Sequence, residues 1–432
     1  MKLCMIGTGY VGLVSGACFA DLGNTVWCVD KDVNKIEKLN NNEIPIFEPG
    51  LEELVIKNSK FGRLKFTTNL GLAVKNSDII FICVGTPISK KNKSADLRYV
   101  FNAASEVSKY INKFKIIVTK STVPIMTGDK IEQIIMKKKR KTLFEVISNP
   151  EFLREGEAIR DFKFPDRIVV GSNNKKINKK LESLYEPLIK KGAAFFSTNR
   201  RGAELIKYAS NAFLATKISY INEVANLCEK TGVDIEDVSI GMGLDKRIGS
   251  RFLRAGPAYG GSCFPKDTKA ITVTADSFKS DLSIIKSVIK SNDKRRILLI
   301  QKIKAILSHK IKNKRITILG VTFKPNTDDM RESLSLLMIP FLQKKGAIIN
   351  YYDPSGEKIE FSNIKNVNFY ENIYDACKKS DLIIIHTEWD EFKSIDFKKI
   401  SKSKKIKVYD LRNLYSPKKM KKMGLTYYSI GR

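Results

Sequence analysis

The chain has 432 residues, of which 43% are hydrophobic and 28% charged, a composition that excludes collagen-like, mucin-like and wholly disordered proteins. Domains average roughly 150 residues, so this length predicts two or three domains. Lysine and arginine number 77 against 46 acidic residues, a formal net charge of +31. Only 17 of those cations are arginine, the residue that most often contacts the bases in nucleic-acid complexes. We therefore interpret most of the charge as solvated surface and expect no specific nucleic-acid partner.

Cysteine and histidine usage narrows the chemistry further. The seven cysteines are scattered and form no CxxC pair, which favours reduced thiols and a cytoplasmic location over a disulfide framework. With only two histidines, no zinc site or other metal site is expected. No apolar run reaches 18 residues, so no membrane association is predicted. The apolar stretch up to Ala20 resembles a signal peptide, but its regularly spaced glycines indicate folded structure.

The first elements predict a dinucleotide-binding βαβ unit. Residues 2–6 form a buried strand, residues 7–12 read GTGYVG, and a helix continues to about residue 22. In this fingerprint Gly7 permits a tight turn, Gly9 lets the backbone approach a pyrophosphate, and Gly12 lets the helix pack against the strand. The helix N-terminus then supplies amide donors to the phosphates.

The next strand, residues 25–29, ends on Asp30, which lies 18 residues after Gly12. A carboxylate there accepts hydrogen bonds from the adenosine ribose hydroxyls and repels a 2′-phosphate, so NAD is predicted over NADP. Lys31 and Lys35 weaken that preference. An ordinary strand-end turn is the alternative interpretation of Asp30.

Polar and turn residues come after three further predicted strands, residues 78–84, 116–119 and 145–147. The segments are Gly85-Thr86-Pro87, Lys120-Ser121-Thr122-Val123-Pro124 and Ser148-Asn149-Pro150-Glu151. Ligands of doubly wound sheets lie at the carboxyl ends of the strands, so these segments are positioned for chemistry. Ordinary turn formation at each proline remains the alternative for any one of them.

The middle of the chain predicts helices. Residues 203–230 have apolar positions at helical spacing, and the helical pattern continues to about residue 310. Lys207 and Asn211 are four residues apart and therefore project from one face of a helix. A surface pair between Glu204 and Lys207 is the alternative interpretation.

From about Lys314 the α/β alternation resumes, with a strand over 315–323, a helix over 330–345 and a strand over 347–352 that closes on Asp353. Gly320 occupies the place that Gly7 has in the first half, but no glycine fingerprint comes after it. We therefore expect an α/β fold with two Rossmann-like, doubly wound parallel-sheet domains joined by a helical central segment. The predicted boundaries are 1–200, 201–310 and 311–432.

The segment from Gly256 to Asp267, GPAYGGSCFPKD, presents a thiol after a glycine-rich stretch. Pro265 fits the first turn of a helix, which places Cys263 at a helix N-terminus with Lys266 nearby, and both influences favour thiolate. A buried structural thiol is the alternative. Together with an NAD site, an activated cysteine predicts oxidation through a covalent thioester.

Several motifs in a fixed order now identify a resemblance to the UDP-glucose/GDP-mannose dehydrogenase family over essentially the full length. They are GTGYVG (7–12), VGTP (84–87), KSTVP (120–124), NPEFLREGEAI (149–159), PDRIVVG (165–171), GLDKRIG (243–249), GPAYGGSCFPKD (256–267) and FKPNTDDMRES (323–333). The sequence departs from the family pattern at Ala258 and Met126, where glycine is common, and at Leu334, where proline is usual.

The resemblance implies two successive NAD-dependent oxidations at C6 of UDP-glucose, which consume two NAD and yield UDP-glucuronate through a Cys263 thiohemiacetal and thioester. It implies a catalytic set of six residues, namely Cys263, Lys207, Asn211, Asp267, Glu151 and Thr122. Lys207 and Asn211 would stabilise oxyanions, Asp267 would hold a water or the Lys207 ammonium, and Glu151 with Thr122 would activate water for hydrolysis.

The resemblance also implies the binding residues. The cofactor contacts are Gly7, Gly9, Val11, Gly12, Asp30, Lys35, Thr86, Thr122, Glu155, Lys266 and Arg331. The substrate contacts are Glu151, Phe152, Leu153, Lys207, Asn211, Arg247, Phe252, Arg254, Gly260 and Lys324, with Arg247 reaching a neighbouring subunit. Segment 1–200 would bind NAD, segment 201–310 would form a homodimer or a larger homo-oligomer, and segment 311–432 would bind the UDP-sugar.

Three alternatives remain open. A sibling enzyme would act on UDP-N-acetylmannosamine, UDP-N-acetylglucosamine or GDP-mannose, and the catalytic set barely distinguishes these sugars. A two-domain hydroxyacid dehydrogenase would transfer a single hydride and need no thiol. A polyanion-binding protein on a relic fold would account for the charge but not for the complete set of catalytic residues.

Overall fold

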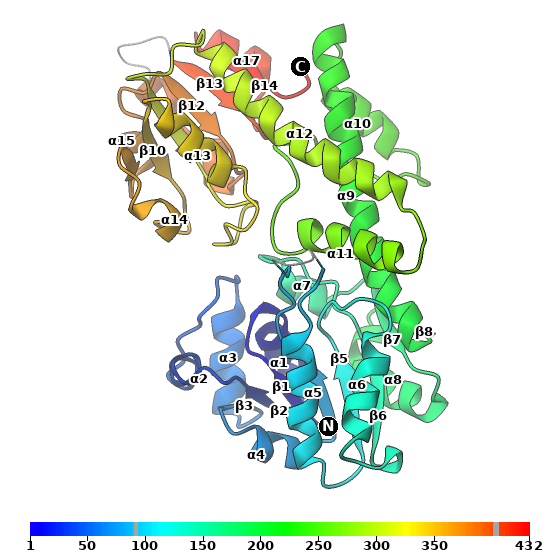
Figure 1. The fold of residues 1–432 in the computed structure, drawn as a ribbon. Coiled ribbons are helices and arrows are strands. Elements are labelled where there is room, and N and C mark those ends of the chain that lie inside the picture. The colour runs from blue at the N-terminus through cyan, green and yellow to red at the C-terminus, as the bar shows by residue number, and fades with distance from the viewer. Residues whose placement is uncertain (90–93, 401–405) are drawn as a thin grey trace. The chain divides into compact units, whose positions relative to one another are not determined.

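A computed structural model describes residues 1–89, 94–400 and 406–432 (Figure 1). The chain forms two compact units. The first unit comprises residues 1–210 and 269–280, and the second comprises residues 211–268 and 281–432. Two helices, α9 (Arg200–Thr231) and α11 (Phe264–Ser277), contribute residues to both units.

The first unit contains an eight-stranded sheet with the order β3-β2-β1-β4-β5-β6-β7-β8. Neighbouring strands are parallel except β6 and β7, which pair antiparallel where Ser148 faces Gly171. The strands are β1 Lys2–Ile6, β2 Thr25–Val29, β3 Leu64–Thr67, β4 Ile79–Ile82, β5 Lys115–Thr119, β6 Phe144–Ser148, β7 Arg167–Gly171 and β8 Ala194–Thr198.

Helices connect these strands, as the right-handed crossovers of parallel strands require. They are α1 Tyr10–Asp21, α2 Val33–Asn40, α3 Leu51–Lys60, α4 Leu70–Lys75, α5 Arg98–Tyr110, α6 Thr127–Met136, the short 3-10 turn Lys141–Leu143, α7 Ala158–Lys163 and α8 Lys175–Ile189. Alternate residues of β1 enter two separate cores: Leu3 and Met5 pack on one face of the sheet, and Cys4 and Ile6 on the other. Both faces are therefore covered, which explains the continuous apolar strands.

The second unit combines long helices with a six-stranded parallel sheet of order β11-β10-β9-β12-β13-β14. Its strands are β9 Arg315–Leu319, β10 Ile348–Tyr352, β11 Val367–Phe369, β12 Leu382–Ile385, β13 Lys407–Asp410 and β14 Thr426–Ser429. Besides parts of α9 and α11, its helices are α10 Ile235–Gly243, α12 Ser283–Ile306, α13 Ser335–Lys344, α14 Ile359–Ser362, α15 Ile373–Cys377, the 3-10 turn Asp390–Ser394, α16 Phe397–Ile400 and α17 Pro417–Lys422.

The two sheets repeat one topology. Six strands of each have the order 3-2-1-4-5-6, so the prediction of two Rossmann-like sheets with helices between them is confirmed. Gly7 and Gly320 both adopt positive φ, 96° and 73°, directly after the first strand of their sheets. Their amides donate to equivalent carbonyls at the second strand, Gly7 to Val29 at 2.7 Å and Gly320 to Tyr352 at 2.8 Å.

The two halves differ in the segment directly after that glycine. In the first unit α1 begins at Tyr10, three residues after Gly7, whereas in the second unit α13 begins only at Ser335, fifteen residues after Gly320. The predicted strand over 315–323 therefore ends at Leu319, and the predicted helix over 330–345 begins five residues late. An intervening loop, residues 320–334, replaces the helix start that follows Gly7 in the first unit.

Strands β7 and β8 extend the first sheet beyond the predicted parallel core. The antiparallel β6–β7 junction places this pair outside the doubly wound order. The sequence signal of β8 is weak because all five of its residues are exposed or only partly buried, whereas every residue of β5 is buried.

Glu204 does not form the surface pair with Lys207 that the sequence allowed as an alternative. It is 2% exposed and accepts hydrogen bonds from the Gly128 amide at 2.7 Å and the Ser148 hydroxyl at 3.3 Å. Glu204 thus caps the N-terminus of α6 and connects it to the start of α9. Burial outweighs these hydrogen bonds and raises the pKa of Glu204 to about 7.

We predict that Glu204→Gln changes the pH dependence of stability. Because the folded-state pKa lies above the unfolded value, the wild-type stabilisation from Glu204 is complete below about pH 4 and is lost as the pH rises through 7. The glutamine variant, which cannot ionise, should gain about 2 kcal/mol relative to wild type between pH 5 and pH 8. Thermal midpoints at the two pH values measure this difference.

Glu132→Gln on α6 is the matched control. Glu132 pairs with Arg200 at 2.7 Å, and although burial opposes its charged form, ion pairs with Lys141 and Arg200 keep its pKa below the ordinary value. The stabilisation that ionised Glu132 gives is therefore present at neutral pH and lost in acid. The Glu132→Gln variant should accordingly have a lower thermal midpoint than wild type at pH 8. A Glu204→Gln difference that is the same at pH 5 and pH 8 would contradict the assigned role of Glu204.

Candidate active site

The glycine loop after β1 has the form that a dinucleotide requires. A Cβ on Gly12 would lie 1.9 Å from the Gly7 carbonyl oxygen and 3.1 Å from the Cys83 side chain, so this glycine permits helix–strand packing as predicted. A Cβ on Gly9 would meet nothing within 4 Å, and no side chain caps α1 at this residue. The N-terminus of α1, with Val11 in its first turn, is therefore open to a phosphate group.

Asp30 lies at the end of β2, beside this loop. Its Oδ2 accepts hydrogen bonds from the amide and the hydroxyl of Thr8, both at 2.9 Å, and Lys35 Nζ lies 3.5 Å away. Burial works against the charged form, but hydrogen bonds from Thr8 and Asp32 and the Lys35 charge outweigh it and hold the pKa of Asp30 below its ordinary value. Asp30 is thus an ionised acceptor that fits the ribose hydroxyls of NAD.

The carboxyl ends of β4 and β5 are joined by side chains of the predicted set. The Thr86 hydroxyl donates to the Thr122 carbonyl at 3.0 Å, and both residues are buried. The neighbouring Ser121 hydroxyl donates to the Val84 carbonyl at 2.7 Å. The VGTP and KSTVP segments therefore form one surface at the carboxyl edge of the sheet, as expected for a doubly wound fold.

A buried ion pair connects the next strand end to α9. Lys207 Nζ lies 3.1 Å from Glu151 Oε1, and the side chains are only 4% and 5% exposed. Glu151 Oε2 accepts from the Leu153 amide at 2.6 Å, and the Lys207 ammonium lies 5.2 Å from the Phe152 ring centroid. These four predicted residues therefore lie together in the first unit, while Glu155 is partly buried later in the same loop.

The second unit brings together Cys263, Asn211, Asp267 and Lys266. The Cys263 carbonyl accepts from the Asp267 amide at 2.8 Å, so Cys263 stands at the N-terminus of α11 as predicted. Asp267, fully buried, accepts from Asn211 Nδ2 at 2.6 Å and pairs with the Lys266 ammonium. Lys266 was predicted as a cofactor contact, and its partner here is Asp267.

Cys263 differs from the other six cysteines in accessibility. It is partly exposed and its sulfur lies 3.4 Å from the Ser262 hydroxyl, whereas the other six thiols are buried. Burial raises the pKa of Cys18, Cys83 and Cys377 to about 12, so these thiols stay protonated and inert. All seven cysteines are free, as the sequence predicted.

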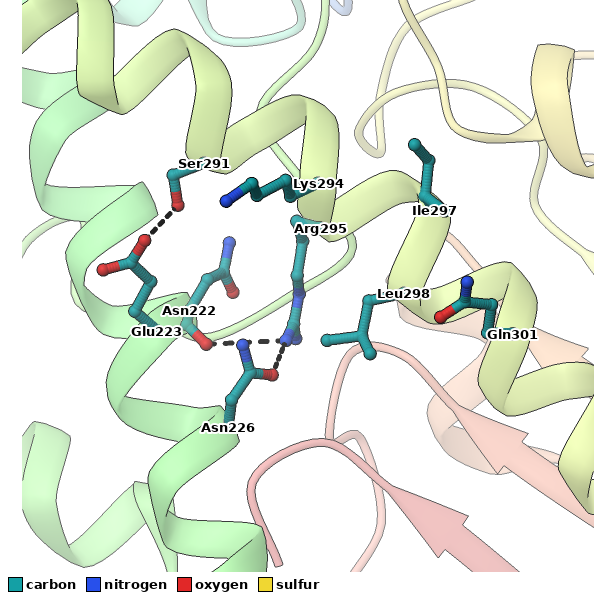
Figure 2. Close-up of a pocket in the computed structure, with 9 residues that line it drawn as sticks. All are labelled: Asn222, Glu223, Asn226, Ser291, Lys294, Arg295, Ile297, Leu298 and Gln301. Atoms are coloured by element: carbon teal, nitrogen blue, oxygen red, sulfur yellow. Dashed lines mark hydrogen bonds between the residues drawn. The ribbon is translucent and has the colours of Figure 1, made fainter.

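Helix α12 supports the segment that leads to Cys263. Asn292 exchanges two hydrogen bonds with the backbone of Tyr259, at 2.9 and 3.1 Å. Arg295 donates to the Gly256 carbonyl at 3.2 Å and to Asn226 of α9. Figure 2 shows Arg295 reaching between α9 and α12 at the wall of a pocket of about 420 Å³, and the residues lining this pocket include no predicted site residue.

Two glycines of this segment, Gly260 and Gly261, lie very close to neighbouring residues. A Cβ on Gly260 would lie 2.6 Å from the Glu332 carbonyl oxygen, and one on Gly261 would lie 2.6 Å from the Phe323 ring. Gly261 also has a φ of +78° and donates to the Arg331 carbonyl at 2.8 Å. These glycines therefore allow the Cys263 segment to pack on the loop 320–334.

The remaining predicted contacts are mostly exposed. Arg247, 88% exposed at its side chain, pairs with Asp245 of its own chain at 2.6 Å. Arg331 pairs with Asp329 at 2.8 Å. Arg254 donates to the Arg412 carbonyl at 3.1 Å.

Phe252 and Lys324 each contact an aromatic ring of the second unit. Phe252 has a φ of +65° and packs edge-on against Phe264, with ring centroids 6.0 Å apart. The Lys324 ammonium lies 5.6 Å from the Phe323 ring centroid. A positive φ in a phenylalanine is costly, which points to a fixed loop at this position.

Sequence reasoning missed Arg412, which lies just after β13. Its guanidinium donates to the Phe323 and His386 carbonyls, each at 2.9 Å, and pairs with Glu388 at 2.7 Å. Its position two residues after the end of β13 was the available signal.

Met126 replaces a glycine that is common in the family, and the structure explains the preference for glycine. Met126 directly precedes α6 and has a φ of +70°, a conformation that glycine adopts without strain. A methionine in the left-handed region costs of order 1 kcal/mol, and the chain tolerates this strain.

Within the described ranges, no group of three or more His, Cys, Asp or Glu residues is arranged to hold a metal ion. Among the same residues, no helix is long and apolar enough to cross a membrane.

The chain is similar in sequence and in structure to known proteins. Three family models match in order: the NAD binding domain of the UDP-glucose/GDP-mannose dehydrogenase family over residues 1–189, its central domain over 201–294 and its UDP binding domain over 317–417. The chain belongs to the UDP-glucose/GDP-mannose dehydrogenase family.

Individual relatives match over the whole chain. A UDP-glucose 6-dehydrogenase of Rhizobium meliloti (strain 1021) is 47% identical and covers 100% of both chains. Among solved structures, a UDP-glucose dehydrogenase from Pyrobaculum islandicum has a TM-score of 0.91 at 36% identity, covering 99% of this chain and 96% of that one. A UDP-D-ManNAc dehydrogenase from Pyrococcus horikoshii has a TM-score of 0.87 at 25% identity, covering 100% and 99%.

We predict that Asp30→Ala changes the cofactor preference. Loss of the carboxylate removes the ribose acceptor and its repulsion of a 2′-phosphate, and it leaves the Lys31 and Lys35 ammonium groups to bind that phosphate. The ratio of kcat/KM for NAD to that for NADP should fall by about 100-fold, that is about 3 kcal/mol. Initial rates with both cofactors measure it.

Asp32→Ala is the matched control, because Asp32 caps α2 by accepting from the Lys35 amide at 3.2 Å and does not contact Thr8. Its cofactor ratio should equal that of wild type. An Asp30 variant with an unchanged ratio would remove Asp30 from the cofactor site.

Proposed function

We propose that this chain is a UDP-glucose 6-dehydrogenase, which converts UDP-glucose to UDP-glucuronate by two NAD-dependent oxidations at C6. The observation that carries the proposal is the end-to-end match to enzymes of that name, at 47% identity, together with a partly exposed Cys263 one helical turn from the buried Asp267–Asn211 pair. A sibling substrate is the second candidate, but the UDP-D-ManNAc dehydrogenase is only 25% identical.

In this proposal, three segments of the chain have different roles. Residues 1–200 hold NAD through the glycine loop and Asp30, which the open N-terminus of α1 supports. Residues 311–432 hold the UDP-sugar, and the absence of a helix start after Gly320 fits a ligand that is not an intact dinucleotide. Residues 201–310 supply Lys207, Asn211 and Cys263. NAD, when bound, supplies the acceptor for the hydride lost in each oxidation.

In the proposed mechanism α9 stabilises negative charge. Lys207 and Asn211, four residues apart on α9, donate to the oxygen at C6 as charge develops on it. Asp267 orients Asn211 by accepting from its amide at 2.6 Å, which leaves the second N–H of that amide for the substrate. Glu151 pairs with Lys207 at 3.1 Å, so the buried ammonium has a carboxylate partner.

Cys263 adds as thiolate to the C6 aldehyde and gives a thiohemiacetal, whose oxidation leaves a thioester. Its place at the N-terminus of α11 favours the thiolate. Glu151 then takes a proton from the water that attacks the thioester, with Thr122 positioning that water, and the Cys263 thiolate leaves. Arg254 and Lys324 are assigned to the diphosphate, and Arg247 to the site of a neighbouring subunit.

A homodimer through the central helices is part of this proposal. Phe213, Tyr220 and Leu227 of α9 are spaced by seven residues and are 65%, 52% and 60% exposed. Large apolar side chains on one helix face indicate a surface that another copy covers. Seven free thiols support a reducing compartment, the cytoplasm.

The substrate test measures NAD reduction with each nucleotide sugar in turn: UDP-glucose, UDP-N-acetylmannosamine, UDP-N-acetylglucosamine and GDP-mannose. We predict that kcat/KM is highest for UDP-glucose, by at least about tenfold. Faster reduction with an N-acetylated sugar would overturn the assigned substrate but leave the family unchanged. No reduction with any of the four sugars would contradict the enzyme class.

The thiol test uses Cys263→Ser. We predict that net turnover falls by about 10⁴-fold or more, or that a slowly hydrolysed intermediate accumulates, because a hydroxyl is a far weaker nucleophile than a thiolate. Cys377→Ala, which removes a buried thiol at the end of α15, should retain activity. Wild-type flux in Cys263→Ser would exclude the thioester route.

A further inference from the structure

Lys120 is a buried cation to which the mechanism above gives no role. It lies directly after β5, is 5% exposed, and belongs to the KSTVP segment that carries Thr122. In the part of the chain that the structure describes, no carboxylate lies within ion-pair distance of its ammonium. Burial of a charge without a paired carboxylate is costly, and surface positions were available for a lysine.

Neutral oxygens surround the Lys120 ammonium instead. Its Nζ lies 3.2 Å from Asn149 Oδ1, 3.5 Å from the Asn149 carbonyl oxygen and 3.5 Å from the Tyr185 hydroxyl of α8. The Tyr185 hydroxyl also donates to Asn149 Oδ1 at 2.5 Å, and Asn149 Nδ2 donates to the Val169 carbonyl at 2.8 Å. Every polar atom of the Asn149 side chain is therefore engaged, with Lys120 as one of its two donors.

This network fixes the start of the loop that carries Glu151. Asn149 lies two residues before Glu151, with Pro150 between them, and its amide donates to the Thr119 carbonyl at 3.0 Å. Lys120 itself lies two residues before Thr122, and its amide donates to the Ile82 carbonyl at 3.0 Å. One ammonium thus connects the ends of β5 and β6, each of which leads to a group assigned to hydrolysis.

The same ammonium contributes charge to this edge of the sheet. The groups that interact electrostatically with Lys120 are Cys83 after β4, Glu151 and Lys207 of α9, and Tyr185 of α8 is in contact with it. Burial is the main influence and lowers the pKa of Lys120 to about 8, so it remains mostly protonated at pH 7. Two buried ammonium groups therefore act on a single buried carboxylate, Glu151.

We propose that Lys120 is a positioning residue for hydrolysis: its ammonium holds Asn149, and thereby the start of the loop that carries Glu151, the group that takes the proton of the attacking water. In that step the water oxygen bonds to the thioester carbon, the C–S bond breaks, Glu151 takes the water proton and Cys263 leaves as thiolate. This proposal rests on the proposed function, since it needs a thioester to hydrolyse.

The test compares Lys120→Met, Lys120→Arg and Tyr185→Phe in the full-length enzyme with UDP-glucose and NAD. For Lys120→Met we expect kcat to fall by about 10- to 100-fold and KM for UDP-glucose to change less than about threefold. Rapid-quench measurements should still show NADH forming before the slow step, because the oxidations do not use Lys120.

The two other variants separate charge from structure. Lys120→Arg keeps a cation that can donate to Asn149 and should recover most of kcat, whereas Tyr185→Phe removes one hydrogen bond to Asn149, keeps the cation and should lower kcat less than Lys120→Met does. If Lys120→Met does not fold, Lys120→Gln provides the neutral variant, with thermal midpoints reported for each protein.

Unchanged kcat in a folded neutral variant would overturn the proposal. A reduced kcat without NADH formation before the slow step would also overturn it, because a merely structural role would slow the oxidations as well as hydrolysis. Wild-type enzyme that does not oxidise UDP-glucose at all would instead contradict the proposed function, so the two failures are distinguishable.

Discussion

The buried ion pair between Lys207 and Glu151 is the constraint on which the arrangement of the first unit depends. Both side chains are withdrawn from water, so each must be held by the other, and removal of one partner would leave an uncompensated charge at a cost of about 3–5 kcal/mol. The pair fixes the start of α9 against the loop after β6.

Other buried polar groups at the carboxyl edge of the first sheet also need partners inside the protein. Glu204 caps α6 from the turn of α9 that precedes Lys207, and Lys120 holds Asn149 at the end of β6. Such networks stabilise a single geometry only when every polar group in them has a hydrogen-bond partner. A core of apolar residues does not impose this condition. The concentration of such networks at the carboxyl ends of the strands is what a reaction site, rather than a structural core, requires.

The two Rossmann-like sheets show how one topology serves two ligands. Both place a left-handed glycine after the first strand, and both have an aspartate after the second strand, Asp30 or Asp353, that accepts from backbone amides after that glycine. Only the first continues directly into a helix, whose open N-terminus suits a pyrophosphate. In the second, the loop 320–334 replaces it and packs on the Cys263 segment.

Local patterns predicted most of the fold, because burial, period and turn chemistry agree in elements such as β1, α1 and β2. The edge strand β8 lacked a clear pattern, since several of its residues are exposed. The site residues were found through motifs, but their partners were not: the sequence does not show that Glu204 turns inward to Gly128, or that Gly260 and Gly261 meet Glu332 and Phe323. Such contacts join residues distant in the chain and depend on the completed fold.

The central feature of the proposed mechanism is that one site oxidises the same carbon twice through a thioester. The most direct measurement is the number of NADH molecules formed per molecule of UDP-glucose, with the sugar limiting and NAD in excess, together with identification of the product. The mechanism predicts two NADH and UDP-glucuronate. One NADH per sugar, with an aldehyde as the released product, would contradict it.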